Sequence, residues 1–109
     1  MSEKQKENKL SVYQTNRFEK QLKRLSETQL QRIEDEIDLI IENPKLGTRK
    51  KGDLSHLWVH KFNLERKQIL LGYSWVEDRL ELYLLNIGPH ENYYETMKKS
   101  RRLDLKTIG

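Results

Sequence analysis

The stretch from Leu57 to Ile87, LWVHKFNLERKQILLGYSWVEDRLELYLLNI, decides the fold. It holds three apolar or aromatic runs of strand length, at 57–64, 68–76 and 80–87, and the links between them, ERK and EDR, are short and polar. Links this short join neighbouring antiparallel strands, because a parallel connection needs a crossover of about a dozen residues or more. The stretch therefore predicts a three-stranded antiparallel meander.

The residues before the meander have helical periodicity. Phe18, Leu22 and Leu25 recur at intervals of four and three, which places them on one helical face. Ser26 has Gln29 three positions later, the spacing of a capping box, and opens a second helix. The apolar stripe of this second helix consists of Leu30, Ile33, Ile37, Ile40 and Ile41. We predict a helical hairpin whose apolar face packs on one side of the sheet and leaves the other side open.

The flanking segments complete the predicted domain. Residues 10–14 favour a short strand, and the sequence from Asn92 to about Arg102 is compatible with a helix. The prediction is a single α+β domain over residues 10–102, with a flexible arm at 1–9 and a tail at 103–109.

Composition limits the classes of protein that this chain can be. Its 109 residues favour one domain, and its net charge of +4 permits a polyanionic partner without identifying one. The absence of cysteine excludes disulfides, zinc thiolate sites and thiol catalysis, and fits a reducing cytoplasm. No apolar run approaches the roughly 20 residues of a membrane span. We expect a cytoplasmic protein without a membrane partner.

The segment Ile87–Tyr94, IGPHENYY, is the strongest candidate for chemistry. If Pro89 ends the strand and a helix starts near His90, then His90 and Tyr94 stand one helical turn apart. A free imidazole exchanges protons near neutral pH, and a phenol beside it suits acid–base work on a phosphodiester. The alternative is a surface histidine at a helix start, with Tyr93 or Tyr94 anchoring the helix on the sheet.

The first meander strand supplies a second set of candidates. On a strand, Trp58, His60 and Phe62 share one face, while Val59 and Lys61 share the other. We expect Val59 to pack on the helices, so that His60 faces the open side, where Trp58 and Phe62 can stack with bases. Lys61 then needs a bulge to reach the same side. The alternative reading places Trp58 and Phe62 in the core.

Basic residues near the next strand can bind phosphate. Arg66 suits bidentate phosphate binding and Lys67 acts as a point charge, although a solvated turn is the alternative. Two further basic clusters, Arg49–Lys51 and Lys98–Arg102, can bind a phosphate backbone if they lie on one side.

Signatures of bound metals and nucleotides are missing. His56 and His60 would lie about 13 Å apart on a strand, too far to share an ion. The sequence also lacks the glycine-rich phosphate loops and the GxSxG nucleophile elbow. We therefore expect no metal site and no cofactor.

Together these motifs resemble the RelE/ParE superfamily of toxins from bacterial toxin–antitoxin modules. The resemblance covers about residues 10–100 and is carried by Asn43-Pro44-Lys45, Lys51–Leu54, Leu57–Phe62 and Ile87–Tyr94. It implies a small fold with a concave sheet face as the active site. It also implies, for the RelE-like branch, metal-independent cleavage of mRNA in the ribosomal A site, in which the 2′-hydroxyl attacks the adjacent phosphate.

The resemblance implies roles for individual positions. The catalytic candidates are His90, Tyr94 and His60, and the candidates for binding RNA or phosphate are Trp58, Lys61, Arg66, Lys67 and Gln68. Lys67 or Gln68 matches a position that is usually arginine in the family. Because Gln68 cannot neutralise a phosphate, Arg66 or Lys67 must then supply the charge.

Two other functions share the implied fold. ParE-like toxins inhibit DNA gyrase and generally lack the His–Tyr arrangement, so His90 and Tyr94 favour the nuclease. A non-catalytic relative that only binds its antitoxin is the third possibility. The implied partners are a cognate antitoxin, the ribosome and mRNA, with operator DNA reached only through the antitoxin.

Overall fold

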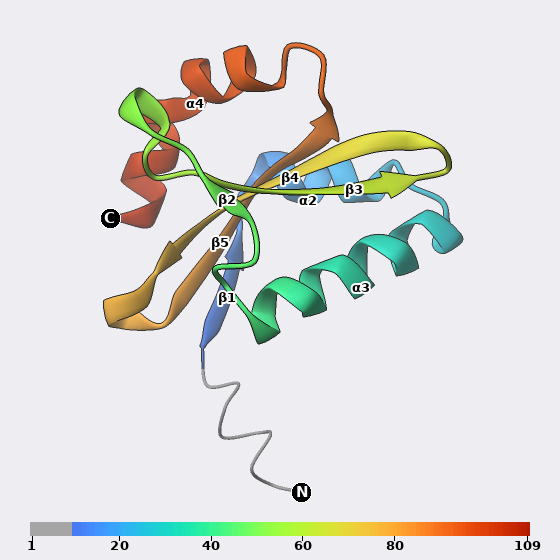
Figure 1. Cartoon of the computed structure of the whole chain (residues 1–109), viewed down its shortest axis with the longest axis horizontal. Helices are drawn as coiled ribbons and strands as arrows, with labels where there is room; N and C mark the ends of the chain where they lie inside the picture. Colours follow the sequence, from blue (N-terminus) through green and yellow to red (C-terminus); the bar gives the residue numbers. More distant parts are fainter. Residues whose placement is uncertain (1–9) are drawn as a thin grey trace, which may run out of the picture.

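The structure is a computed structural model that describes residues 10–109, so the predicted arm at residues 1–9 lies outside the described residues. In chain order the elements are β1 (Ser11–Gln14), α2 (Asn16–Lys23), α3 (Glu27–Glu42), β2 (Thr48–Arg49), η1 (Gly52–Leu54), β3 (Trp58–Leu64), β4 (Lys67–Val76), η2 (Glu77–Arg79), β5 (Glu81–Pro89) and α4 (Tyr93–Ile108). Figure 1 shows one sheet with α2 and α3 on one side and α4 on the other. The predicted α+β class is confirmed.

The strands of the described residues form one mixed sheet in the order β1-β5-β4-β3-β2. β3, β4 and β5 make the predicted antiparallel meander, and β1 lies parallel to β5 at the outer edge. The sequence does not predict β2, which pairs only Thr48 and Arg49 with β3. A strand of two residues has no periodic pattern to reveal it.

The helical hairpin covers one face of the sheet with the predicted apolar seam. The Ser26 hydroxyl accepts a hydrogen bond from the backbone N–H of Gln29, whose side chain accepts one from the backbone N–H of Ser26. This is the predicted capping box. The buried core beneath the hairpin includes Phe18, Ile33 and Ile40, and Leu22, Leu25 and Ile37 pack against it.

A β-bulge in β5 changes which residues face each layer. The register shift opposite Gly72 and Tyr73 leaves Leu85 as an extra residue. Leu84 and Ile87, three positions apart, therefore both pack on the α2/α3 side. Because a bulge bends its strand and re-aims the side chains that follow, it sets the direction in which β5 leaves the sheet.

α4 covers part of the opposite face. Tyr93 and Met97, from its first turns, are buried against Val59 and Leu70 of the sheet. The sheet therefore has helices on both faces rather than one open side. None of the helices within residues 10–109 is long and apolar enough to span a bilayer.

The last helix is longer than the sequence predicts. It continues to Ile108, so residues 103–108 are helical and do not form the expected loose tail. Asp104 is completely buried and forms an ion pair with Arg17 of α2 at 3.2 Å. A polar residue that faces inward breaks the apolar pattern by which a helix is recognised in a sequence, so the pattern ends too early.

We predict that Ile40→Ala lowers the free energy of unfolding by about 2–5 kcal/mol, because it removes a fully buried side chain and leaves a cavity. Leu39→Ala is the matched control, since Leu39 precedes Ile40 on α3 and is 46% exposed. Its effect should stay within about 0.5 kcal/mol in urea unfolding. Equal effects of the two changes would show that the hairpin does not pack on the sheet through Ile40.

Candidate functional site

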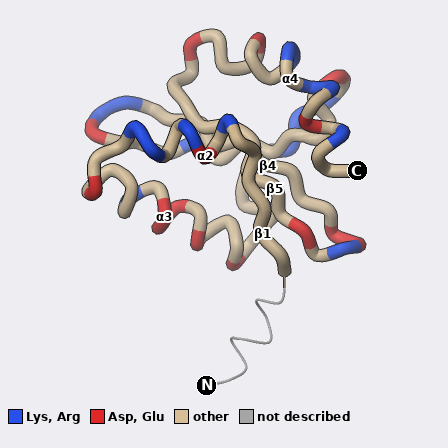
Figure 2. Tube along the Cα trace, turned by 180° about the vertical axis from the view of Figure 1, so that it is seen from behind, with Lys and Arg blue, Asp and Glu red and all other residues tan. Residues whose placement is uncertain are grey.

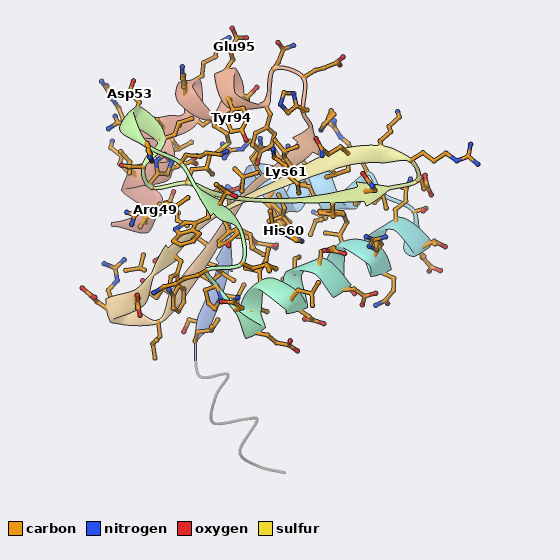
Figure 3. All side chains as sticks on the ribbon, in the orientation of Figure 1. Arg49, Asp53, His60, Lys61, Tyr94 and Glu95 are labelled. Atoms are coloured by element: carbon orange, nitrogen blue, oxygen red, sulfur yellow. The ribbon has the colours of Figure 1, made fainter. Side chains whose placement is uncertain are left out.

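Strand register places Lys61 on the α4 face of the sheet. Val59 packs in the core beneath α4, and Lys61, two residues further along β3, points the same way. Lys61 is exposed and pairs across the sheet with Leu70, which in turn pairs with Gly88 near the end of β5. In Figure 3 the labelled Lys61 lies on the α4 side of β3, and the labelled His60 lies on the α3 side.

His90 and Tyr94 meet at the start of α4. Their ring centroids are 6.1 Å apart and the rings are nearly perpendicular. His90 lies before the helix rather than in it, because α4 begins at Tyr93 after Asn92 adopts a left-handed conformation. The predicted contact is therefore present, but a turn and not a helical spacing produces it. His90 is exposed, and Tyr94 is half-buried.

One member of the basic cluster Arg49–Lys51 lies over the ring of Tyr94. The Lys50 ammonium is 5.1 Å from the ring centroid, within the range of a cation–π interaction. The backbone N–H of Lys50 donates to the carbonyl of Leu57 at 2.9 Å, which holds this residue beside β3. The basic triplet 49–51 is the signal that could have identified Lys50, but its spacing does not show which member faces α4.

Tyr93 anchors the site and takes no part in its exposed surface. Its hydroxyl donates a hydrogen bond to the carbonyl of Asn86 at 2.9 Å, and its side chain is almost fully buried. Burial raises the pKa of the Tyr93 phenol far above its ordinary value, so the ring stays neutral. Tyr94 packs edge-on against it with centroids 5.5 Å apart. One tyrosine is therefore structural, and Tyr94 is the one available to a ligand.

The expectation that His60 faces an open side of the sheet is wrong. His60 Nε2 lies 2.6 Å from Glu36 Oε1 of α3, and its ring stacks on Phe62 with centroids 5.6 Å apart. Trp58, on the same face, stacks on Tyr73 at 6.2 Å and packs against the core under the hairpin. The large aromatic side chains fill the space under α2 and α3, while the smaller residues of β3 face α4. The alternative reading of Trp58 and Phe62 as core residues is the correct one.

Glu36 makes His60 part of a structural cluster. The second carboxylate oxygen of Glu36 accepts a hydrogen bond from Arg32 at 2.9 Å, and the Arg32 guanidinium lies over the Phe62 ring. Burial alone would raise the pKa of the Glu36 carboxyl, but the hydrogen bonds from His60 and Arg32 outweigh it and hold the pKa below its ordinary value.

The phosphate-binding candidates around the β3–β4 turn separate in space. Glu65 and Arg66 form the turn itself with φ of +50° and +74°, and Arg66 is exposed at its tip. Lys67 shares its strand face with Ile69 and so lies on the α2/α3 side. Gln68 shares its face with Leu70, on the side of Lys61. Gln68, which carries no charge, is therefore the residue of this group that lies on the face of the candidate site. Lys67 does not supply a positive charge there.

The candidate site thus consists of Lys50, Lys61, His90 and Tyr94, all on the α4 face. It combines a titratable imidazole, a phenol and two ammonium groups, which can exchange a proton and neutralise an anionic phosphate. Within residues 10–109, no three His, Asp or Glu side chains lie close enough to one another to hold a metal ion.

Comparison with known proteins identifies the family. Residues 12–98 match the model of the ParE-like toxin of type II bacterial toxin–antitoxin systems. The chain belongs to this family. It is a type II toxin of the RelE/ParE superfamily, as the sequence motifs indicate.

RelE toxins are among the solved structures that share this fold. A free mutant of Escherichia coli RelE superposes with a TM-score of 0.65 at 15% identity, over 86% of this chain and 97% of that chain. The RelBE2 toxin–antitoxin complex of Mycobacterium tuberculosis gives 0.63 at 13% identity, over 74% and 98%. The RelE–RelB complex of Pyrococcus horikoshii gives 0.55 at 17%, over 75% and 96%. A search of curated proteins finds no match to the toxin.

We predict that Glu36→Gln destabilises the toxin at pH 7 by about 1–2 kcal/mol and flattens its acid dependence. Because the folded-state pKa of Glu36 is lowered, its contribution is complete above the unfolded value of 4.5 and is lost as the pH falls through the lower folded value. Urea unfolding at pH 7 and pH 3 measures both effects. Asp38→Asn, an exposed neighbour on α3, is the control. An unchanged acid dependence in Glu36→Gln would contradict this assignment.

We predict that Gly72→Ala displaces the start of α4. A Cβ at Gly72 would collide with the Tyr93 hydroxyl oxygen, so about 1–3 kcal/mol of stability should be lost. Adding Tyr93→Phe to Gly72→Ala removes the colliding oxygen and should restore part of the melting temperature. Gly88→Ala is the control, since nothing lies within 4 Å of its Cβ position. If Gly72→Ala melts like Gly88→Ala, this contact does not hold α4.

Proposed function

We propose that the toxin is a metal-independent, ribosome-dependent mRNA endoribonuclease that inhibits translation. The observation that carries the proposal is the Tyr94 ring, which lies nearly perpendicular to the His90 imidazole and has the Lys50 ammonium over its face. Lys61 shares this face of the sheet. A site for inhibiting another protein by contact alone has no need of an exposed imidazole beside a phenol and two cations.

Cleavage needs two proton transfers and stabilisation of one charged phosphate. The 2′-hydroxyl loses its proton as its oxygen attacks the adjacent phosphorus, and the bond to the 5′-oxygen breaks as that oxygen gains a proton. The products are a 2′,3′-cyclic phosphate and a 5′-hydroxyl end. His90 supplies a group that exchanges protons, and Lys50 and Lys61 stabilise the charge on the phosphate oxygens. Tyr94 offers its hydroxyl to the reacting groups.

The ribosome enters the proposal because the site itself holds few groups that can orient RNA. Gln68 stands on the α4 face where a charged residue would hold the backbone, so a free RNA is poorly fixed. A ribosome that presents mRNA in a near-attack geometry can supply several kcal/mol of the barrier reduction. We therefore expect efficient cleavage only of ribosome-bound mRNA.

A cognate antitoxin is the proposed stable partner. RelB accompanies RelE in the complexes from Mycobacterium tuberculosis and Pyrococcus horikoshii that share this fold. Contact with operator DNA would then take place through the antitoxin. Inhibition of DNA gyrase is the second candidate function, and the ParE-like family model is the observation that favours it.

We predict that His90→Ala and Lys50→Met abolish growth inhibition while the protein stays folded, because both side chains lie outside the buried cores. Loss of a positioned acid or base costs about 10²–10⁴ in rate. Tyr94→Phe keeps the ring and removes the hydroxyl, so it distinguishes the role of the ring from that of the hydroxyl. Lys106→Met, an exposed lysine on α4 outside the basic cluster Lys98–Arg102, is the control and should remain toxic. Growth, circular dichroism and mapping of mRNA 5′ ends after induction are the measurements.

Each alternative predicts a different outcome of the same experiment. Translation arrest with cuts in ribosome-bound mRNA supports the nuclease. Loss of gyrase activity with intact mRNA supports the gyrase inhibitor. If the His90→Ala variant still causes that loss, the nuclease is overturned. Rapid cleavage of naked transcripts by the purified toxin would contradict only the requirement for the ribosome.

A further inference from the structure

The two edges of the sheet are protected to different degrees. β2 ends the sheet on one side with only two residues, one of which is Arg49. Short edge strands and charged side chains are two devices that keep a free edge from pairing with another chain. β1 ends the sheet on the other side, and its residues, Ser11–Gln14, are all exposed. This strand has no charge, no proline and no bulge in its pairing with β5, so its edge is unprotected.

The backbone of β1 uses only half of its hydrogen-bonding groups within the described chain. The N–H groups of Ser11 and Thr15 donate to carbonyls of β5 at 2.9 and 3.0 Å. Because alternate residues of a strand face alternate sides, Tyr13 also faces β5. The N–H and C=O groups of Val12 and Gln14 then face outward, where no strand formed by residues 10–109 lies. These groups offer a ladder to one further strand.

Two apolar side chains at this edge are nearly half exposed. Val12 is 42% exposed and lies in register with Leu82, so it faces the α2/α3 side of the sheet. Tyr13 is 45% exposed and faces the α4 side, where its ring stacks on that of Tyr83 with centroids 5.0 Å apart. A strand added beside β1 would therefore cover apolar surface on both sides of the sheet.

The absence of charge on β1 favours a second copy of the same chain as the added strand. When two identical strands pair antiparallel about a two-fold axis, the residue on the axis lies opposite itself, so a charge there would meet an identical charge. Figure 2 shows β1 without the Lys, Arg, Asp or Glu that mark the helices around it. Neutral residues occupy this edge although 35% of the chain is charged. Arg17, just beyond the strand, is already paired with Asp104.

We propose that the toxin forms a two-fold symmetric dimer in which β1 pairs antiparallel with β1 of a second copy and joins the two sheets into one. Val12 lies on the axis opposite its own counterpart, and Leu10 lies opposite Gln14. This register keeps the pairing within residues 10–14. An axis at Tyr13 would instead set Leu10 against Asn16, the first residue of α2, whose backbone does not continue the ladder.

The dimer is weak and leaves the candidate site free. One short strand buries much less than the about 800 Å² per partner of a standard interface, so we expect a dissociation constant on the order of 10–100 μM. β5 and β4 separate β1 from β3, which carries Lys61. His90 follows Pro89, at the opposite end of β5 from the residues 81–84 that pair with β1. The dimer therefore does not depend on the proposed nuclease.

Single cysteines test the register, because the chain has none of its own. Hydrogen-bonded residues directly opposite each other have Cα atoms about 5.5 Å apart, within reach of a disulfide. Mild oxidation of the full-length toxin with Val12→Cys should therefore yield mainly a disulfide-linked dimer. Gln14→Cys should stay largely monomeric, since about 13 Å of strand would separate the two cysteines. Equal cross-linking of the two variants would overturn the proposal.

Sedimentation equilibrium of the full-length toxin, from about 5 to about 500 μM, measures the dimer without a cross-link. Val12→Lys places two ammonium groups across the axis and should weaken the dimer at least about tenfold. Leu39→Lys introduces the same charge at a side chain of similar exposure on α3 and should change it less than about twofold. Equal effects of the two changes, or a monomer over the whole range, would contradict the proposal.

The backbone pairing has a test of its own. Val12→Pro removes an N–H that β5 does not use, so the melting temperature should change little while the dimer is lost. Hydrogen exchange at the amides of Val12 and Gln14 should slow as the toxin concentration rises, and exchange at Ser11, already bonded to β5, should not. Protection of the Val12 amide that is equally strong in dilute toxin would place another segment of the same chain on this edge and overturn the dimer.

Discussion

The close packing of Tyr93 on Gly72 is the contact on which the candidate site depends. The absence of a side chain at Gly72 lets the phenol reach the carbonyl of Asn86 on the neighbouring strand. That hydrogen bond fixes the first turn of α4 to the sheet, so the next residue, Tyr94, projects over the face that carries Lys61. His90 is then constrained from both sides, by the end of β5 and by the start of the helix. A buried contact therefore determines the geometry of an exposed one.

The sequence predicts most of the architecture because the relevant signals are local. Short polar links determine the meander, and the spacing of apolar residues with the Ser26 capping box determines the hairpin. The layer that each face of β3 meets cannot be predicted in this way. Alternation shows that His60 and Lys61 point in opposite directions, but not which layer each direction meets. That depends on how helices from distant parts of the chain cover the two faces, and both faces prove to be covered.

Comparison of the two histidines shows what the sequence cannot reveal about chemistry. His60 and His90 each lie beside aromatic residues and near basic ones. The structure gives His60 a buried carboxylate, which commits its ring to holding α3 on the sheet. It gives His90 an exposed position against Tyr94 and no carboxylate partner within residues 10–109. Lys50 is a similar case, because the sequence does not show which residue of the basic triplet 49–51 contacts the Tyr94 ring.

The ion pair between the partly exposed Arg17 and the buried Asp104 joins the first helix of the described chain to the last. Burial raises the pKa of the Asp104 carboxyl, and the Arg17 guanidinium opposes that rise, so removing Arg17 while Asp104 stays buried would leave an unpaired polar group. The ion pair therefore ties the later turns of α4 to α2. Amide hydrogens near the buried Asp104 should therefore exchange more slowly than those at the exposed end of the helix.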